Sequence, residues 1–89
     1  MLALPPELTQ RQATACLRLL LQGLKAQPER AVRVDAKALT RFDSTALAVL
    51  LECRRAALSE GRGFAVQDLP LALAGMARLY GVDGLLTGG

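Results

Sequence analysis

The chain has 89 residues, which is enough for one domain with a single modest core. Apolar residues make up 52% and charged residues 21%, a composition that excludes an intrinsically disordered chain. The net charge of +3 is mild, and the longest unbroken apolar run, Ala46 to Leu51, is far shorter than the roughly 20 residues that cross a bilayer. The start, Met1 to Leu4 followed by two prolines, lacks the basic residues of a secretory signal. We therefore predict one soluble, cytoplasmic domain over residues 1–89, with a frayed tail at 87–89.

The inventory of reactive side chains argues against an enzyme. No histidine is present, which removes the commonest acid–base catalyst and metal ligand. Cys16 and Cys53 match no zinc or redox spacing, and each is predicted to be a small core residue rather than a reactive thiol. With only Phe42, Phe64 and Tyr80 as aromatic residues, a surface that stacks nucleic-acid bases is not expected. The composition thus predicts no cofactor, no metal and no nucleic-acid partner.

The first third of the chain predicts a short strand followed by a helix. Leu2 to Leu4 is an apolar run closed by prolines, as in a truncated strand. Thr9 and Gln12 stand at the spacing of a capping box, with Thr9 at the N-cap and Gln12 three residues later. Apolar residues then recur at helical spacing until a proline stops them, which predicts a helix from Gln10 to Ala26.

Three basic residues, Arg11, Arg18 and Lys25, lie seven apart on the far side of this helix. A row of cations on a helix is usually a solvated face. Such a row also suits attraction to anionic lipid headgroups or to an acidic partner. The sequence leaves these interpretations open.

The remaining chain alternates short strand-like runs with apolar helical segments. The predicted elements are a strand over Ala31–Asp35, a turn over Ala36–Phe42 anchored by Leu39 and Phe42, a helix that follows Asp43–Thr45 and ends at Ser59 or Glu60, a strand over Phe64–Gln67, a helix from Pro70 to about Gly81 and a short element over Val82–Leu86. Gly61 is placed to end the second helix in the left-handed conformation. The alternation predicts an α/β fold, a small mixed sheet that is at least partly parallel and is backed by three to four helices.

The second and third helices carry more apolar surface than one side of a sheet covers. The predicted core stripe of the second helix consists of Leu47, Leu50, Leu51 and Leu58. In the third helix, Leu71 and Leu79 fall outside the inner stripe. The surplus is either buried by mutual packing of the helices or left for a partner. In the second case the docking face consists of Ala46, Val49, Cys53, Arg54 and Leu79, with the Arg54 stem buried and its head paired.

Asp43, Ser44 and Thr45 lie where a loop becomes the second helix, and three interpretations compete. The first is helix capping by Asp43 or Ser44. The second is phosphorylation of Ser44 or Thr45, which would place a phosphate near the positive helix end and its unpaired N–H groups, beside a repelling Asp43. The third is contact of the hydroxyls with a partner. A nucleophilic serine is disfavoured, because the chain has no histidine and no other base is evident nearby.

The segment from Thr40 to Leu51, with Asp-Ser-Thr near its centre, resembles the signature of STAS domains, the fold named after sulfate transporters and anti-sigma-factor antagonists. Phe64 to Pro70 is similar to the family's strand entering its third helix, and Met76 to Val82 is similar to the end of that helix in one branch. That branch is the small cytoplasmic STAS subunit of the ABC transporter for outer-membrane lipid asymmetry. The resemblance covers about Leu2 to Leu86.

This resemblance implies protein binding rather than catalysis. In the lipid-transport branch the turn and its helix contact the ATPase subunit, which implies a bacterial accessory subunit that reaches the inner membrane only through the transporter. In the antagonist branch the hydroxyl that corresponds to Ser44 is phosphorylated by a kinase that is an anti-sigma factor. An anti-sigma-factor antagonist is therefore the alternative function.

Two features depart from the family pattern. Ala46 stands two positions after the phosphoacceptor, where Gly is frequent. The N-terminal strand region is shortened, because only Leu2 to Leu4 remains of the usual first strand pair. If that strand is absent, the exposed sheet edge is expected to support a homodimer.

Overall fold

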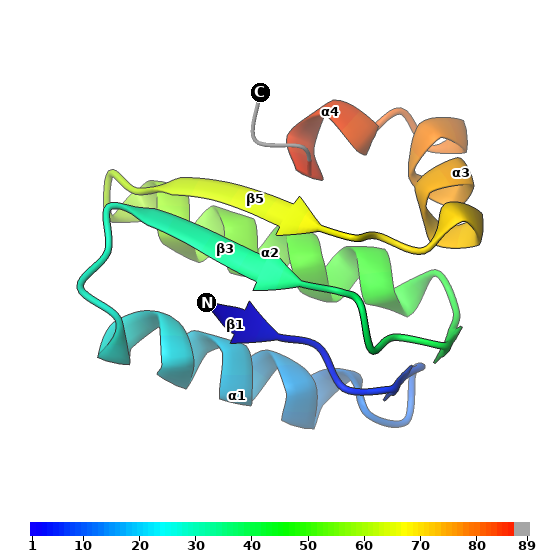
Figure 1. The fold of residues 1–89 in the computed structure, drawn as a ribbon, viewed down its shortest axis with the longest axis horizontal. Helices are drawn as coiled ribbons and strands as arrows, with labels where there is room; N and C mark the ends of the chain where they lie inside the picture. Colours follow the sequence, from blue (N-terminus) through cyan, green and yellow to red (C-terminus); the bar gives the residue numbers. More distant parts are fainter. Residues whose placement is uncertain (87–89) are drawn as a thin grey trace.

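The computed structural model describes residues 1–86, so the predicted frayed tail at 87–89 lies outside the described residues. In chain order the elements are β1 (Leu2–Ala3), β2 (Glu7–Leu8), α1 (Ala13–Ala26), β3 (Ala31–Asp35), β4 (Arg41–Phe42), α2 (Thr45–Ser59), β5 (Gly63–Gln67), α3 (Leu71–Leu79) and α4 (Asp83–Leu86). The α/β class is confirmed (Figure 1). Within residues 1–86, no helix combines the length and the hydrophobicity that crossing a bilayer requires.

Parallel strands form the frame of the molecule. One sheet has the order β1-β3-β5, and β2 pairs with β4 in a second, smaller one. Every described strand pair is parallel, so the prediction of a mixed sheet is wrong. The reason is that a helix connects each strand of the larger sheet to the next, and such a crossover brings the chain back in the same direction.

The first strand, β1, is present although it has only two residues. Leu2 pairs with Val34 and Ala3 with Asp35, so β1 covers this end of the β3 edge. The homodimer was expected on the condition that this strand is missing, and that condition is not met. The homodimer itself stays a prediction.

The core lies between the larger sheet and helices α1 and α2. In β3, Val32 and Val34 are fully buried whereas Arg33 between them is exposed, which identifies the inner face of the sheet. Helix α2 runs behind β3 and β5 in Figure 1, and α1 packs beside α2. The inner face of the sheet and the inner sides of these helices therefore form one continuous core.

Helix α1 begins at Ala13, three residues later than predicted. The Gln12 side chain accepts the N–H of Thr9 at 2.9 Å, which is one half of a capping box. The other half does not form, because the Thr9 hydroxyl donates to Gln12 Oε1 at 2.7 Å and the Gln12 N–H bonds to the Thr9 carbonyl instead. Residues 9–12 therefore form a turn that precedes the helix.

Helices α2 and α3 both end on a glycine with a positive φ angle, at Gly61 (72°) and Gly81 (73°). After α2, the N–H of Gly61 bonds to the Leu58 carbonyl and the N–H of Arg62 to the Ala57 carbonyl. This pair of hydrogen bonds is a Schellman motif. Gly61 permits it because glycine has no Cβ to clash in the left-handed region. The predicted end of the second helix is confirmed.

Arg62, which the sequence did not single out, ties three segments together beside that helix end. Its guanidinium donates to the carbonyl oxygens of Leu24 at 2.7 Å, Glu29 at 2.8 Å and Gln27 at 2.9 Å. Only 11% of its side chain is exposed. The largely buried guanidinium is therefore satisfied by carbonyl dipoles at the negative end of α1 and in the loop that follows it, and by the Glu60 carboxylate, whose Oε1 lies 3.3 Å from Nη1.

Candidate functional site

The loop that enters α2 is organised by the carboxylate of Asp43. Oδ1 accepts the N–H of Thr45 at 2.8 Å, and Oδ2 accepts the N–H of Gln10 at 3.1 Å. One side chain therefore caps α2 and also ties its first turn to the loop that precedes α1. The Thr45 side chain, the Thr45 N–H and the Gln10 N–H hold the pKa of Asp43 below its usual value, because each favours the charged form.

Ser44 occupies the N-cap position of α2 without acting as the cap. Its backbone is helical, with φ −62° and ψ −18°, and its side chain makes no capping hydrogen bond. The residue is exposed, and no described residue is a hydrogen-bond partner of its hydroxyl. Capping is thus the role of Asp43, and the Ser44 hydroxyl is accessible from outside the domain.

The first turn of α2 has few free N–H groups to offer a phosphate. The Thr45 N–H is held by the Asp43 carboxylate. The N–H groups of Ala46 and Leu47 bond to the carbonyls of Asp43 and Ser44. The unpaired N–H groups expected from the sequence are therefore occupied, because the turn closes on itself. A phosphate on Ser44 would instead lie close to the Asp43 carboxylate, and repulsion would weaken the contacts of that carboxylate.

Three of the five residues predicted for the docking face are buried, which corrects the composition of that face. Ala46, Val49 and Cys53 are at most 3% exposed. They belong to the core because α1 packs along one side of α2 and β5 along another. Most of the wide apolar arc of α2 is thus used for packing within the domain. Arg54 is half-buried, and Leu58, predicted for the core stripe, is 44% exposed.

Helix α3 exposes more of its apolar surface than α2 does. Leu71 is 91% exposed and Leu79 is 81% exposed, whereas Leu73 and Ala77 are fully buried on the inner side. The exposed side, which we call the α3 face, consists of Leu71, Ala72, Gly75, Arg78 and Leu79. Leu79 is therefore at the surface, as a docking residue must be. Leu71 is part of the same exposed surface but was not included in the predicted docking face. Its position outside the inner stripe of the helix already indicated exposure.

The start of α2 and helix α3 lie at the same end of the molecule (Figure 1). Because β3 and β5 are parallel, their carboxyl ends share one edge of the sheet, and the loops toward α2 and α3 both leave from that edge. This end therefore combines an accessible hydroxyl with an exposed apolar helix. We call it the Ser44 end.

Comparison with known families identifies the fold. The family model described as "Mlab, STAS domain" matches residues 1–87. The chain belongs to the STAS domain family. Members of this family generally act as binding domains rather than as enzymes. Among curated proteins, none matches this chain.

The buried cysteines of this STAS domain are core residues, as predicted. Cys16 is 6% exposed and Cys53 is fully buried. Burial raises the pKa of Cys16, and burial with a further contribution from Cys16 raises the pKa of Cys53 to about 11. Both thiols therefore stay protonated and unreactive near neutral pH. Within the described 86 residues, no group of three or more His, Cys, Asp or Glu side chains is arranged to hold a metal.

A hollow of about 470 Å³ lies near the opposite end of α2, away from Ser44. Lys25, Gln27, Glu29, Arg30 and Arg62 are among the residues that line it. The Arg62 guanidinium is already engaged by three carbonyls, so it is not free to bind a ligand there. The hollow is therefore separate from the Ser44 end, and the role of Arg62 in it is structural.

Proposed function

We propose that this STAS domain is a non-enzymatic cytoplasmic subunit that binds and supports the ATPase of a phospholipid ABC transporter. The observation that carries the proposal is the Ser44 hydroxyl, which is exposed and without a partner at a turn held firmly by Asp43. In the lipid-transport branch that the sequence resembles, this turn is the part that contacts the ATPase. The match to the MlaB type of STAS domain supports the same assignment.

The α3 face supplies apolar area at the same end of the molecule as this turn (Figure 1). Two leucines with more than four-fifths of their surface exposed are suitable anchors for a partner, because apolar anchors gain most when an interface removes them from water. The residues between them, Ala72 and Gly75, are small and exposed, so a partner helix is able to approach the α3 backbone closely. We therefore place Ser44 at the polar rim and Leu71 and Leu79 at the centre of the interface.

A charge placed at Ser44 tests the turn. Ser44→Glu adds a carboxylate beside Asp43 and is expected to weaken binding of the purified ATPase at least tenfold, measured by titration calorimetry. Ser59→Glu, the same chemical change near the other end of α2, is the matched control and is expected to bind as the wild type does. Unchanged affinity of Ser44→Glu would exclude the turn from the interface.

A second substitution tests the α3 face. Leu71→Asp and Leu79→Asp together are expected to reduce ATPase affinity more than tenfold, with unchanged circular dichroism, because both side chains are exposed in the free domain. Leu19→Asp, at an exposed leucine on α1, is the matched control. If the control loses as much affinity as the double variant, the α3 face is not the docking surface.

A second candidate function is that of an anti-sigma-factor antagonist switched by phosphorylation of Ser44. The same accessible hydroxyl favours it, and the buried methyl group of Ala46 leaves the surface around Ser44 unobstructed. Incubation with a kinase-type anti-sigma factor and ATP is expected to label the wild type and Ser59→Ala but not Ser44→Ala. Absence of labelling in the wild type would remove this candidate.

An affinity pull-down from the cytoplasm and membranes of the source cell separates the two functions. Recovery of an ABC ATPase with its permease supports the first function. Recovery of a kinase-like anti-sigma factor supports the second and contradicts the first.

A further inference from the structure

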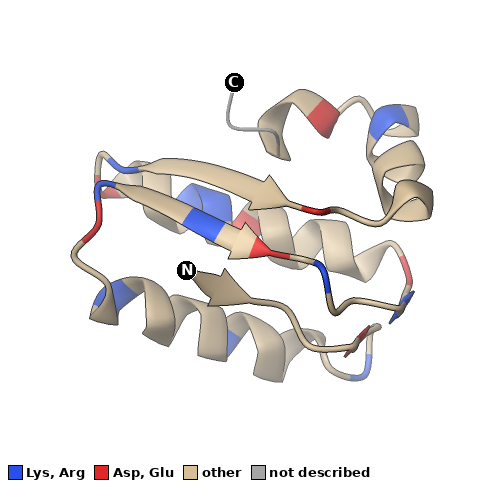
Figure 2. Ribbon diagram, viewed as in Figure 1, with Lys and Arg blue, Asp and Glu red and all other residues tan. Residues whose placement is uncertain are grey.

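The excess positive charge of the domain is concentrated on α1 and the turn before it. The chain has 11 Lys and Arg residues and 8 Asp and Glu residues. Arg11, Arg18 and Lys25 lie in the segment Thr9–Ala26, which contains no acidic residue. The other eight cations balance the eight acids, so the net charge of +3 resides on this segment. Figure 2 shows α1 with blue positions and no red ones.

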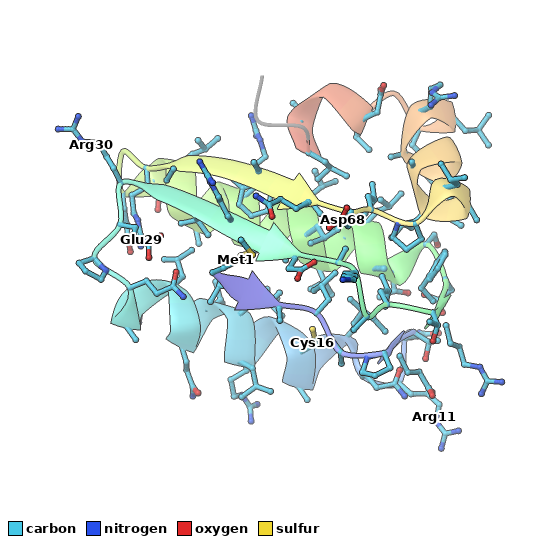
Figure 3. All side chains as sticks on the ribbon, viewed as in Figure 1. Met1, Arg11, Cys16, Glu29, Arg30 and Asp68 are labelled. Atoms are coloured by element: carbon cyan, nitrogen blue, oxygen red, sulfur yellow. The ribbon has the colours of Figure 1, made fainter. Side chains whose placement is uncertain are left out.

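These three cations are exposed and have no partner within residues 1–86. No ion pair or side-chain hydrogen bond engages them, and each residue is exposed. Figure 3 shows the Arg11 side chain pointing away from the body of the molecule. The field of an unpaired, exposed cation is available to an anionic surface.

The exposed side of α1 is a long strip of cations with one large apolar residue. Arg18 and Lys25 are seven residues apart, which is about 10 Å along a helix axis. They lie away from the buried side of α1, which is formed by Cys16, Leu20 and Leu24. Leu19 is 68% exposed on the outer side. We call this surface the α1 face, and it consists of Ala15, Arg18, Leu19, Gln22, Lys25 and Ala26 of α1 together with Arg11, which was predicted to lie on the helix but lies in the turn before α1.

We propose that the α1 face binds anionic phospholipid headgroups directly. A row of Lys and Arg attracts the negative surface of a membrane, and an exposed leucine beside the row is able to enter the headgroup region. A nucleic acid is a poorer fit, because the α1 face has no aromatic residue on which a base stacks and an exposed leucine gains nothing from a phosphate backbone. The helix forms a long outer side of the molecule, the shape that a flat bilayer accommodates (Figure 1).

This lipid contact goes beyond ATPase binding and does not depend on it. Figure 1 shows α1 and α3 on different sides of the molecule, so the part of the α1 face that lies on α1 itself, with Arg18, Leu19 and Lys25, stays open when the α3 face is covered. Each Lys or Arg near an anionic surface strengthens partitioning about fivefold, so three cations give about a hundredfold preference for anionic over neutral lipid. The contact is therefore weak in isolation and acts mainly on a domain already held near the bilayer.

The test is co-sedimentation of the purified domain with phosphatidylcholine vesicles, with or without about one-third phosphatidylglycerol, at low salt, where the screening length is long. We expect about a hundredfold preference for the anionic vesicles and its loss at about 1 M salt. The variant with Arg11→Gln, Arg18→Gln and Lys25→Gln is expected to lose the preference. The matched control, with Arg30→Gln, Arg33→Gln and Arg78→Gln, has the same net charge and keeps the α1 face, so it is expected to retain the preference.

Two results of this comparison overturn the proposal. One is a wild type without preference for anionic vesicles. The other is equal loss in both triple variants, since only the net charge would then matter. Circular dichroism checks the fold of each variant. If the α1 variant is unfolded, Arg18→Gln alone replaces it, with an expected fivefold loss of partitioning.

Leu19 distinguishes a membrane from other polyanions. Leu19→Ser is expected to weaken vesicle binding severalfold and to leave binding to heparin unchanged, because only a bilayer offers an apolar layer for the side chain. Tighter binding to a short RNA or DNA duplex than to anionic vesicles, insensitive to Leu19→Ser, would overturn the lipid assignment in favour of a nucleic acid.

Discussion

The two ends of α2 satisfy their free backbone groups by different means. At the C-terminal end the backbone N–H groups of Gly61 and Arg62 bond to carbonyls of α2, and the Arg62 side chain, only 11% exposed, donates to carbonyls of α1 and the loop after it. At the N-terminal end the Asp43 carboxylate does the capping, and the neighbouring Ser44 hydroxyl is exposed and unused. The comparison separates structure from function along one helix. The end whose polar groups are consumed serves stability, whereas the end with a spare polar group is available to a partner.

Removal of Arg62 is expected to have the largest effect on stability. Arg62→Leu leaves the carbonyls of Leu24, Gln27 and Glu29 without their shared donor, at an expected cost of about 3 kcal/mol in the free energy of unfolding. Urea denaturation followed by circular dichroism measures it. Arg62→Lys, which keeps the charge but not the three-way geometry, is expected to recover only part of the loss. An ordinary surface substitution costs less than about 0.5 kcal/mol. A cost this small for Arg62→Leu would show that the three hydrogen bonds from Arg62 to the carbonyls do not stabilise the fold.

Two glycine substitutions are expected to have opposite signs. Gly61→Ala forces a Cβ into the left-handed region, at a cost of about 1 kcal/mol, although no atom lies within 4 Å of the added group. Gly75→Ala, in the interior of α3 and equally free of neighbours, is expected to stabilise by about 0.5–1 kcal/mol. Thermal unfolding of the two variants measures the difference. The same sign for both would show that the Gly61 conformation is not required.

The Asp43 cap predicts a dependence of stability on pH at the other end of α2. The pKa of Asp43 is lowered in the folded state from its ordinary value of 3.8, so the unfolded chain binds the proton more tightly. The contribution of Asp43 is therefore complete above about pH 5, is lost as the pH falls through 3.8 toward the lower folded value, and is absent below that value. Asp43→Asn is expected to flatten the decline of stability between about pH 5 and pH 2. An equally steep decline in the variant would assign the acid sensitivity to other carboxylates.

Ser44→Ala is expected to have the smallest effect on stability. A serine that caps a helix contributes about 1 kcal/mol, but here the cap is Asp43, so the change should stay within about 0.5 kcal/mol. Thermal unfolding of Ser44→Ala beside Asp43→Ala checks this division of roles, and the aspartate variant should be the less stable of the two. The reverse order would return the capping role to Ser44.

Local patterns in the sequence predicted much of this molecule. Apolar spacing predicted a helix that follows Thr45 and ends at Ser59 or Glu60, close to the observed Thr45–Ser59, and the position of Gly61 predicted its left-handed end. The start of α1 was predicted three residues too early. The spacing of Thr9 and Gln12 is that of a capping box, which placed the predicted start at Gln10. In the structure, residues 9–12 form a turn, and the Gln10 N–H bonds to the carboxylate of Asp43, which is 33 residues away. Such a contact leaves no local signal.

The sequence by itself determined the order of β1, β3, β5 and the helices, the turn at Asp43–Thr45 and the resemblance to STAS domains, because each depends on neighbouring residues. It did not predict β2 and β4, because each has two residues and forms only by pairing with a distant segment; Arg41–Phe42 was expected in a turn. Only the tertiary structure decided which apolar residues are core. Ala46, Val49 and Cys53 extend the apolar arc of α2, and Leu71 and Leu79 that of α3, yet the first three are buried and the last two are exposed. The reason is that burial depends on which element packs against a helix. Helix α1 and β5 cover the sides of α2, whereas no other described element covers the outer side of α3.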